Sequence, residues 1–274
     1  MLNGVLLIHK EKGMTSHDVI DALRKRYKQK KFGHTGVLDP MADGLLVVLC
    51  GKATKILQFL RDTDKEYIAS FQLGTSTDTD DIYGQVVDTK EINLDFDLDQ
   101  VLQSFVGKQH LQVPMASNKK VNGKKLLDYK RQGIKAPVVY QDIEIYSMTK
   151  CSEDSFRIHC SSGTYVRSVC RELALRTNNL GCMKSLTRTK VGRFRLEQAQ
   201  SLNDLQTQDP ELYSTKMLLD HYPMIEMDDI TEVMQGKPLD LPCTEEAVCL
   251  LHKDQPVAIY QKNGDRYVSK RGLW

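Results

Sequence analysis

The chain has 274 residues, of which 41% are hydrophobic and 27% charged, and its formal net charge is +2. This length accommodates one large domain, or one domain with a small appendage, around a hydrophobic core. Its apolar runs are too short to span a membrane, and the first of them is followed by Lys10, Glu11 and Lys12, which does not fit a signal peptide. These features argue against membrane-spanning and exported classes and predict a cytoplasmic globular protein.

The first 73 residues predict strands, two helices and one conspicuous loop. A helix begins at Thr15 or Ser16, because either hydroxyl can cap it and apolar residues then recur at helical spacing up to Tyr27. Three glycines and a proline predict a tightly turned loop at residues 33–44. The predicted strands cover residues 4–9, 45–50 and 67–73, and a short helix covers residues 54–60.

The middle of the chain predicts a further mixture of strands and helices. Residues 74–84 form a polar loop, and Gly133 ends a helix that begins at Lys124. Thr164 is the expected N-cap of a helix that extends to Thr177. The remaining elements are a strand at residues 85–88, a helix at 99–105 and paired strands at 138–150 and 155–160.

A change in character near residue 205 predicts a domain boundary. Residues 206–216 are polar and contain Pro210, which indicates a linker. We therefore expect one domain at residues 1–208 and a small β-rich domain at residues 215–274. The fold class is α+β, because strands and helices do not alternate regularly enough for a doubly wound parallel sheet. The strand-like segments of the small domain are residues 247–251, 256–260 and 266–269.

Positive charge is concentrated in three blocks of this near-neutral chain. The blocks cover residues 24–31, 119–135 and 184–195, and an acidic stretch lies at residues 78–99. Each block by itself is typical of a solvated helix face. Together they favour RNA or DNA as a partner, because phosphates bind basic surfaces.

The seven cysteines predict buried free thiols. Their number is odd and no two have the CxxC spacing, which argues against a disulfide framework and a zinc ribbon. Most have apolar neighbours, as Cys50 and Cys249 do. His34 and Asp39 have a spacing that could bind a metal, but no third ligand is near them in the sequence, so we expect no metal site.

The motifs of several common enzyme classes fail or are missing. Residues 44–54 come closest to a phosphate-binding loop, but six residues separate the glycines and Ala53 stands where Ser or Thr is needed. No GxGxxG, GxSxG or HExxH motif occurs. The remaining candidate is the loop GHTGVLDPMADG, in which a proline follows Asp39 and favours an extended or turn geometry. Either this carboxylate acts on a nucleic acid that approaches the glycines closely, or it only bonds its own turn.

The same loop resembles the signature of the TruB-type pseudouridine synthases. Other segments match that family in order along the chain: VLLIHKEKGMTSHDV, GKATK, DKEYIASFQLG, TDTDDIYG, YKRQG and HCSSGTYVRSV. The resemblance covers most of residues 4–195, and its GHTGxLDP portion is highly specific. It implies a pseudouridine synthase α+β domain with a mixed, largely antiparallel central sheet. It also implies that the C-terminal segment is a small RNA-binding domain similar to PUA.

The resemblance implies roles for individual residues. Asp39 is the catalytic aspartate, Tyr67 packs against the target base and is a candidate proton acceptor, and Arg167 pairs with Asp39. The resemblance also implies that His34 contacts the flipped nucleotides, that Asp81 lies near the RNA, and that Tyr165 and Leu186 help form the pocket. The basic blocks, and not the resemblance, predict that Lys30, Lys31 and Lys120 bind phosphates.

The implied reaction converts uridine to pseudouridine by breaking the bond from base nitrogen to sugar carbon and remaking it at a ring carbon. No electrons or atoms are gained, so neither a redox cofactor nor ATP is expected. Whether Asp39 attacks the sugar, attacks the ring or removes a sugar proton stays open. The nucleotide must flip out of its loop to reach the carboxylate. The resemblance implies uridine 55 in the T loop of the tRNA T arm as the substrate, and we expect a monomeric enzyme without a guide RNA.

Several residues depart from the family's pattern. They concern the walls of the cleft and the phosphate contacts more than the catalytic group, and they are His9, Glu11, Val113, Ala116, Asn118 and Thr187. Two alternatives are a guide-RNA-dependent relative and an RNA-binding or RNA-folding protein without catalysis. The presence of Asp39, Tyr67 and Arg167 argues against the second alternative, although a folding role could accompany catalysis.

Overall fold

The structure, a computed structural model, describes residues 1–60 and 64–274. It divides into two compact units. The first unit comprises Met1–Pro40, Leu46–Arg61 and Gln198–Trp274, and the second comprises Met41–Leu45 and Asp62–Glu197. In the part of the chain that the structure describes, no helix combines the length and the apolar character needed to cross a bilayer.

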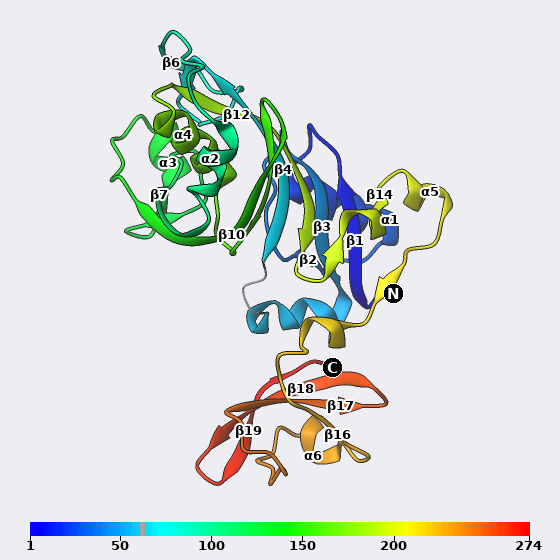
Figure 1. Ribbon diagram of the computed structural model, residues 1–274. Coiled ribbons are helices and arrows are strands. Elements are labelled where there is room, and N and C mark those ends of the chain that lie inside the picture. The colour runs from blue at the N-terminus through cyan, green and yellow to red at the C-terminus, as the bar shows by residue number, and fades with distance from the viewer. Residues whose placement is uncertain (61–63) are drawn as a thin grey trace. The chain divides into compact units, whose positions relative to one another are not determined.

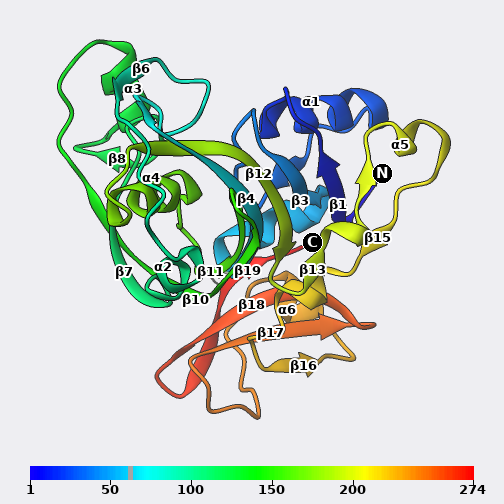
Figure 2. The ribbon, with the colours of Figure 1, turned by 45° about the horizontal axis from the view of Figure 1, so that its top comes forward.

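The first unit is built on two neighbouring strands that are buried along nearly their whole length. Strand β1 (Gly4–Lys10) and strand β3 (Asp43–Cys50) contain the two apolar runs that predicted strands at residues 4–9 and 45–50. Helix α1 (Ser16–Tyr27) packs its apolar face into the same core (Figure 2). Strand β14 runs parallel to β1, whereas β15 is antiparallel to β1 and β2 is antiparallel to β3. The other elements are β2 (Phe32–His34), η1 (Gly51–Phe59), β14 (Gln200–Ser201), α5 (Asp204–Thr207), β15 (Leu212–Tyr213) and η3 (Thr215–Leu218).

The second unit contains a largely antiparallel sheet in the order β12, β4, β11, β10, β7. The first residues of β3 run parallel to β12, so the pairing is mixed, and the predicted α+β class is confirmed. Strand β4 (Lys65–Leu73) buries every second residue from Tyr67 to Phe71, as predicted. Helix α4 (Val166–Arg176) lies against β12 and β4. The other elements are β5 (Thr75–Thr77), β6 (Val86–Thr89), α2 (Leu98–Gln103), β7 (Gly107–Gln112), β8 (Lys120–Val121), β9 (Lys124–Lys125), α3 (Leu126–Arg131), β10 (Tyr140–Ser152), β11 (Ser155–Cys160), β12 (Gly181–Val191), β13 (Phe194–Arg195) and η2 (Leu196–Gln198).

The last part of the chain forms a small, PUA-like sheet with its own hydrophobic core (Figure 1, orange and red). Helix α6 (Thr231–Met234) contributes Val233 to this core. The predicted domain limits, residues 1–208 and 215–274, stay a prediction. The small sheet lies within residues 215–274, but the first compact unit contains both this sheet and the N-terminal residues. The strands, in spatial order, are β16 (Met224–Glu226), β17 (Ala247–His252), β18 (Gln255–Asn263) and β19 (Arg266–Gly272).

Two local predictions were wrong, and one strand was not predicted. Tyr165, and not Thr164, is the N-cap of α4, and the Thr164 hydroxyl instead donates to the carbonyl of Ser161 at 2.9 Å. Residues 206–216 are not a plain linker, because α5 ends there and β15 pairs with β1. Strand β12 was not predicted, because its lysines and arginine obscure the alternation of buried and exposed residues that marks a strand.

Candidate active site

Asp39 lies in the connection between β2 and β3, residues 35–42, which we call the aspartate loop. The main-chain N–H of Thr35 donates to the carbonyl of Val47 at 3.1 Å and so ties the start of the loop to β3. Asp39 itself is half-buried. The loop bends at residues 35–36 and turns at residues 40–41, whereas residues 37–39 are not in a turn and strands occupy both ends of the predicted range.

Hydrogen bonds fix the main chain on both sides of Asp39. On one side, the N–H of Leu38 donates to Oγ of Ser16 at 2.9 Å, and the same hydroxyl lies 3.3 Å from the carbonyl oxygen of Leu38. On the other side, the N–H of Gly13 donates to the carbonyl of Pro40 at 2.8 Å. The Asp39 carboxylate therefore projects from a backbone that hydrogen bonds with Gly13 and Ser16 hold in place.

Three predicted RNA-binding residues precede this loop. His34 is the last residue of β2 and is half-buried. Lys30 and Lys31 are exposed between α1 and β2. Next to them, the buried side chain of Gln29 accepts from the N–H of Leu2 at 2.8 Å and donates to its carbonyl at 3.0 Å. The two lysines therefore project from an anchored segment.

Tyr67 is buried in the middle of β4, opposite Arg188 of β12. The Arg188 side chain donates through Nε to the carbonyl of Leu45 at 2.8 Å and is hydrogen-bonded to Tyr67. Burial lowers the pKa of Arg188, and Tyr67 acts against this shift. Leu186, two residues before Arg188, is also buried. The sequence analysis placed Arg188 in the third basic block, residues 184–195, which was interpreted as exposed. For Arg188 this interpretation was wrong, because only 2% of the residue is exposed.

Arg167 lies in the first turn of α4, and only 5% of the residue is exposed. Its guanidinium donates to the carbonyl of Thr79 at 2.9 Å and to that of Ala116 at 3.0 Å, and Nη1 lies 3.7 Å from Oδ2 of Asp81. One guanidinium thus joins three segments that are distant in sequence. The predicted pairing of Arg167 with Asp39 stays a prediction.

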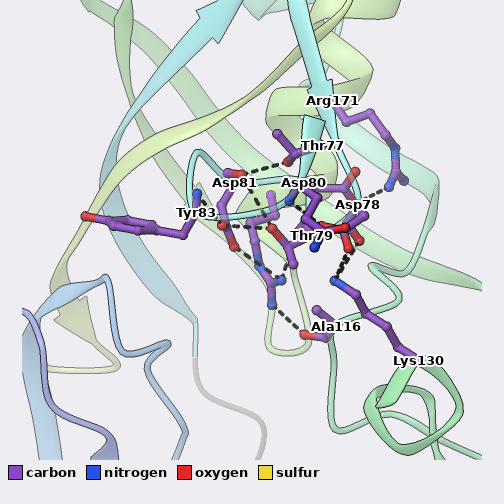
Figure 3. Close-up of polar contacts among 11 residues, drawn as sticks. Thr77, Asp78, Thr79, Asp80, Asp81, Tyr83, Ala116, Lys130 and Arg171 are labelled. Atoms are coloured by element: carbon purple, nitrogen blue, oxygen red, sulfur yellow. Dashed lines mark hydrogen bonds and ion pairs between the residues drawn. The ribbon is translucent and has the colours of Figure 1, made fainter. Parts of the chain in front are cut away.

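The segment that contains Asp81, residues 78–85, is held mainly by its aspartates, and we call it the acidic loop. The hydroxyl of Thr79 donates to Oδ1 of Asp81 at 2.9 Å, and the N–H of Tyr83 donates to the same oxygen at 3.0 Å. Figure 3 shows Asp78 facing Lys130 and Asp80 facing Arg171, while the Tyr83 ring points away from them. The ion pairs are Asp78 with Lys130 (2.8 Å), Asp80 with Arg171, and Asp81 with Arg167.

These surroundings shift the pKa values of two aspartates in opposite directions. The hydrogen bond from Lys130 is the main cause that lowers the pKa of Asp78. Burial raises the pKa of Asp80, and the charges of Arg171 and Arg167 oppose this shift. The charge of Asp80 therefore depends on its arginine neighbours, because its burial favours the protonated form.

The remaining predicted residues lie at the ends of secondary-structure elements in the second unit. Tyr165 is half-buried and directly precedes α4. Lys120 is exposed on β8. Ala116, which departs from the family's pattern, contributes its main-chain carbonyl to Arg167, so this contact does not depend on the side chain at position 116.

The sequence did not single out Ser16, Arg171 or Arg188 as parts of a site. The sequence did contain a signal for Ser16. Only one of two adjacent hydroxyl residues can cap α1, and since Thr15 is the cap, the Ser16 hydroxyl must have another partner. No signal existed for Arg188, since a charged side chain is normally exposed. In the first unit Asp39 offers a carboxylate for nucleophilic or acid–base chemistry. The second unit holds a buried tyrosine, Tyr67, and two buried arginines, Arg167 and Arg188.

The fold places the chain in a known class of α+β proteins. It matches a chain in the "Crystal Structure of a Cbf5-Nop10-Gar1 Complex" with a TM-score of 0.72 and 21% identity, which covers 99% of this chain and 85% of that chain. At this identity the likeness concerns the fold alone.

Sequence comparison then gives the family. The family model "TruB family pseudouridylate synthase (N terminal domain)" matches residues 24–166, which is more than half of the chain. The tRNA pseudouridine synthase B of Oceanobacillus iheyensis is 37% identical, with 96% of this chain and 93% of that protein covered. The protein of the same name from Bacillus subtilis is 36% identical, with 96% and 91% covered. The chain belongs to the TruB family of pseudouridine synthases and is, as predicted, an enzyme of the isomerase class.

Proposed function

We propose that this enzyme isomerises uridine 55 in the T loop of tRNA to pseudouridine, with Asp39 as the catalytic carboxylate. The observation that carries the proposal is the aspartate loop, in which Asp39 projects from a main chain that is hydrogen-bonded on both sides. This loop lies inside the matched region of the family, and the relatives that resemble the chain along most of its length are named tRNA pseudouridine synthases.

The reaction needs few protein groups. Asp39 acts on the sugar or the ring of a uridine that has flipped out of its loop, at a cost of roughly a few kcal/mol. Tyr67 and Leu186 offset this cost through stacking and apolar contact, and Tyr67 is the candidate acceptor for the proton released from ring carbon. Arg167 keeps the Asp39 carboxylate ionised when the two pair, because an adjacent cation favours the charged form.

Contacts with the RNA outside the reacting nucleotide are assigned to exposed residues and to residues near the loop. Lys30, Lys31 and Lys120 bind phosphates of the T arm, which their exposure supports. His34 contacts the flipped nucleotides, and Tyr165 helps to form the pocket. Asp81 lies close to the RNA and orients Arg167, which its ion pair with that residue supports.

We also propose that the enzyme acts as a monomer in the cytoplasm without a guide RNA. The similarity to the Oceanobacillus protein extends over 93% of that protein at 37% identity. The match to the Cbf5 complex has 21% identity and supports only a shared fold. A guide-dependent reaction is therefore the weaker alternative, and it is tested by leaving guide RNA out of the assay.

The central test is Asp39→Asn with an unmodified tRNA transcript as the substrate. The wild type should release tritium from labelled uridine without added guide, and chemical labelling with primer extension should map the product to position 55. Asp39→Asn should retain RNA affinity and lose turnover by at least about 1,000-fold, because the neutral amide cannot act as nucleophile or base.

A matched control is Asp95→Asn, which makes the same chemical change at an exposed aspartate and should leave turnover unchanged. Substantial residual turnover in Asp39→Asn would overturn the assigned role of this carboxylate. A product at another position, or none without a guide, would overturn the proposed substrate or the stand-alone mode.

A further inference from the structure

Thr15 and Ser16 are adjacent hydroxyl residues at the start of α1 with different tasks. The Thr15 hydroxyl accepts from the N–H of Asp18 at 3.1 Å, and the Asp18 carboxylate accepts from the N–H of Thr15 at 2.7 Å. This reciprocal pair caps the helix and leaves the Ser16 hydroxyl for another partner. Ser16 is only 3% exposed, so its hydroxyl needs a partner inside the protein.

That partner is the main chain of Leu38, 22 residues further along the chain. Oγ of Ser16 accepts from the N–H of Leu38 at 2.9 Å and is positioned to donate to its carbonyl at 3.3 Å. The carbonyl of Leu38 belongs to the peptide group that joins Leu38 to Asp39. One hydroxyl therefore holds both peptide groups of Leu38, including the one that leads directly into Asp39.

The other side of Asp39 is restricted as well. Pro40 has a fixed φ and disfavours the helical conformation at Asp39. Its carbonyl accepts from the N–H of Gly13 at 2.8 Å. The peptide group before Asp39 and the one that follows Pro40 are both hydrogen-bonded, and Pro40 restricts the residue between them, so the direction in which the Asp39 side chain leaves the backbone has little freedom.

Ser16 is itself firmly anchored. It is the first residue of α1, whose residues Val19, Ile20 and Leu23 are at most 2% exposed in the core of the first unit. The hydroxyl of Ser16 thus transmits the position of a packed helix to the backbone beside Asp39.

We infer that Ser16 is a positioning residue for the catalytic carboxylate and acts through the main chain of Leu38. This inference rests on the proposed role of Asp39 and adds a residue to which the family resemblance assigned no role. A catalytic group that is displaced by about 1 Å can lose about 100-fold in rate, so a small shift of the loop should affect turnover more than RNA binding.

The test compares Ser16→Thr with Ser16→Val, because the two side chains have nearly the same volume and differ by one hydroxyl. Single-turnover rate, kcat, KM and RNA affinity are measured on the full chain, well below the melting temperature of each variant. Ser16→Thr should keep most of the single-turnover rate. Ser16→Val should be about 10- to 100-fold slower than Ser16→Thr, with KM and RNA affinity within about 2-fold of each other.

Thr15→Ala is the control for a weakened helix start, and it should lower the melting temperature while leaving kcat near that of the wild type. Ser16→Ala adds no bulk and replaces Ser16→Val in the comparison if Ser16→Val does not fold. Its single-turnover rate should then be reduced as expected for Ser16→Val. Equal rates in Ser16→Thr and Ser16→Val, or a rate in Ser16→Ala equal to that in Thr15→Ala, would overturn the inference.

Asp39→Asn in the same assay separates two kinds of failure. If it is inactive while the Ser16 variants are fully active, only the role of Ser16 fails. If it is active, the proposed function of Asp39 fails first.

Discussion

Two loops of this protein carry aspartates and are held in different ways. In the aspartate loop, the bonds on either side of Asp39 come from neutral groups, the Ser16 hydroxyl and the Gly13 N–H, and they act on the main chain. In the acidic loop, aspartate side chains bond to cations from α3 and α4. The first arrangement fixes the backbone from which a carboxylate projects, whereas the second uses the carboxylates themselves to fix a backbone.

Carboxylates thus have two different settings in this chain: neutral groups hold the main chain beside Asp39, whereas the aspartates of the acidic loop hold their own loop. A hydroxyl that holds a loop adds no charge beside a neighbouring carboxylate, so it does not perturb the pKa of that group through charge. Ion pairs join segments that are distant in sequence, but their strength depends on pH, salt and burial. We therefore expect the acidic loop to respond to the removal of charge and the aspartate loop to respond to changes that disturb its main chain.

The largest effect on stability is expected for Arg167→Met. The substitution leaves Asp81 buried beside an apolar side chain and removes a donor from the carbonyls of Thr79 and Ala116. The loss of one partner of a buried ion pair should lower the free energy of unfolding by about 3–5 kcal/mol. Urea denaturation at neutral pH measures this change.

Arg167→Lys separates the effect of the charge from the effect of the hydrogen bonds, because lysine keeps the charge but cannot make the contacts of the planar guanidinium. It should recover only part of the stability. If Arg167→Met were as stable as the wild type, the acidic loop would not depend on this ion pair, and the contrast between the two loops would be lost.

A somewhat smaller effect is expected for Gly44→Ala, just after the aspartate loop. Gly44 has φ +113°, and a Cβ atom there would lie 2.4 Å from the carbonyl oxygen of Arg188 and 2.5 Å from its nitrogen. Main-chain atoms inside a sheet cannot move away easily, so we expect a loss of about 3 kcal/mol in the free energy of unfolding.

Gly84→Ala in the acidic loop is the matched comparison. There a Cβ atom would meet side-chain oxygens, Oγ1 of Thr79 at 2.3 Å and Oδ1 of Asp78 at 2.7 Å. Side chains can rotate, so the loss should be about 1–2 kcal/mol. An equal or larger loss for Gly84→Ala would contradict the view that the main chain just after the aspartate loop is packed more closely than the main chain of the acidic loop.

The smallest effect is expected for Lys130→Gln, and its pH dependence identifies its cause. The pair of Lys130 with Asp78 is partly exposed and should contribute only about 0.5 kcal/mol at neutral pH. Because the pair lowers the pKa of Asp78, its contribution is present above the ordinary aspartate pKa of about 4 and is lost as pH falls through the lowered value.

The difference in unfolding free energy between the wild type and Lys130→Gln should therefore shrink as the pH is lowered below about 4. The difference between Ser16→Thr and Ser16→Val should not change over the same range, since no ionisable group is altered. A pH dependence of equal size in both comparisons would contradict the distinction between ionic and neutral restraints.

Much of the fold of the two units could be predicted, because its signals are local. The apolar runs of β1 and β3, the helical spacing in α1 and the alternation in β4 each reflect burial within one element. The free cysteines are mostly buried, as their apolar neighbours indicated. Strand β12 was missed because Arg188, a charged residue, is buried against Tyr67 and Leu45, which no local pattern reveals.

Less of the candidate site than of the fold could be predicted from the residues themselves. The glycines and proline around Asp39 marked an unusual loop by themselves, whereas the roles of Tyr67 and Arg167 came only from the family resemblance and stay predictions. The ion pairs could not be predicted, because many acidic and basic residues could have paired. Asp78 meets a lysine 52 residues away, and Asp80 meets an arginine 91 residues away.

The sequence by itself determined the family, the reaction class and the loop that presents Asp39, because these depend on motifs and on short-range preferences of glycine, proline and apolar residues. The tertiary structure alone decided that Ser16 and not Thr15 holds this loop, and that Asp81 is a carboxylate partner of Arg167. Such contacts depend on how helices and strands pack. Packing brings together residues that no local pattern relates.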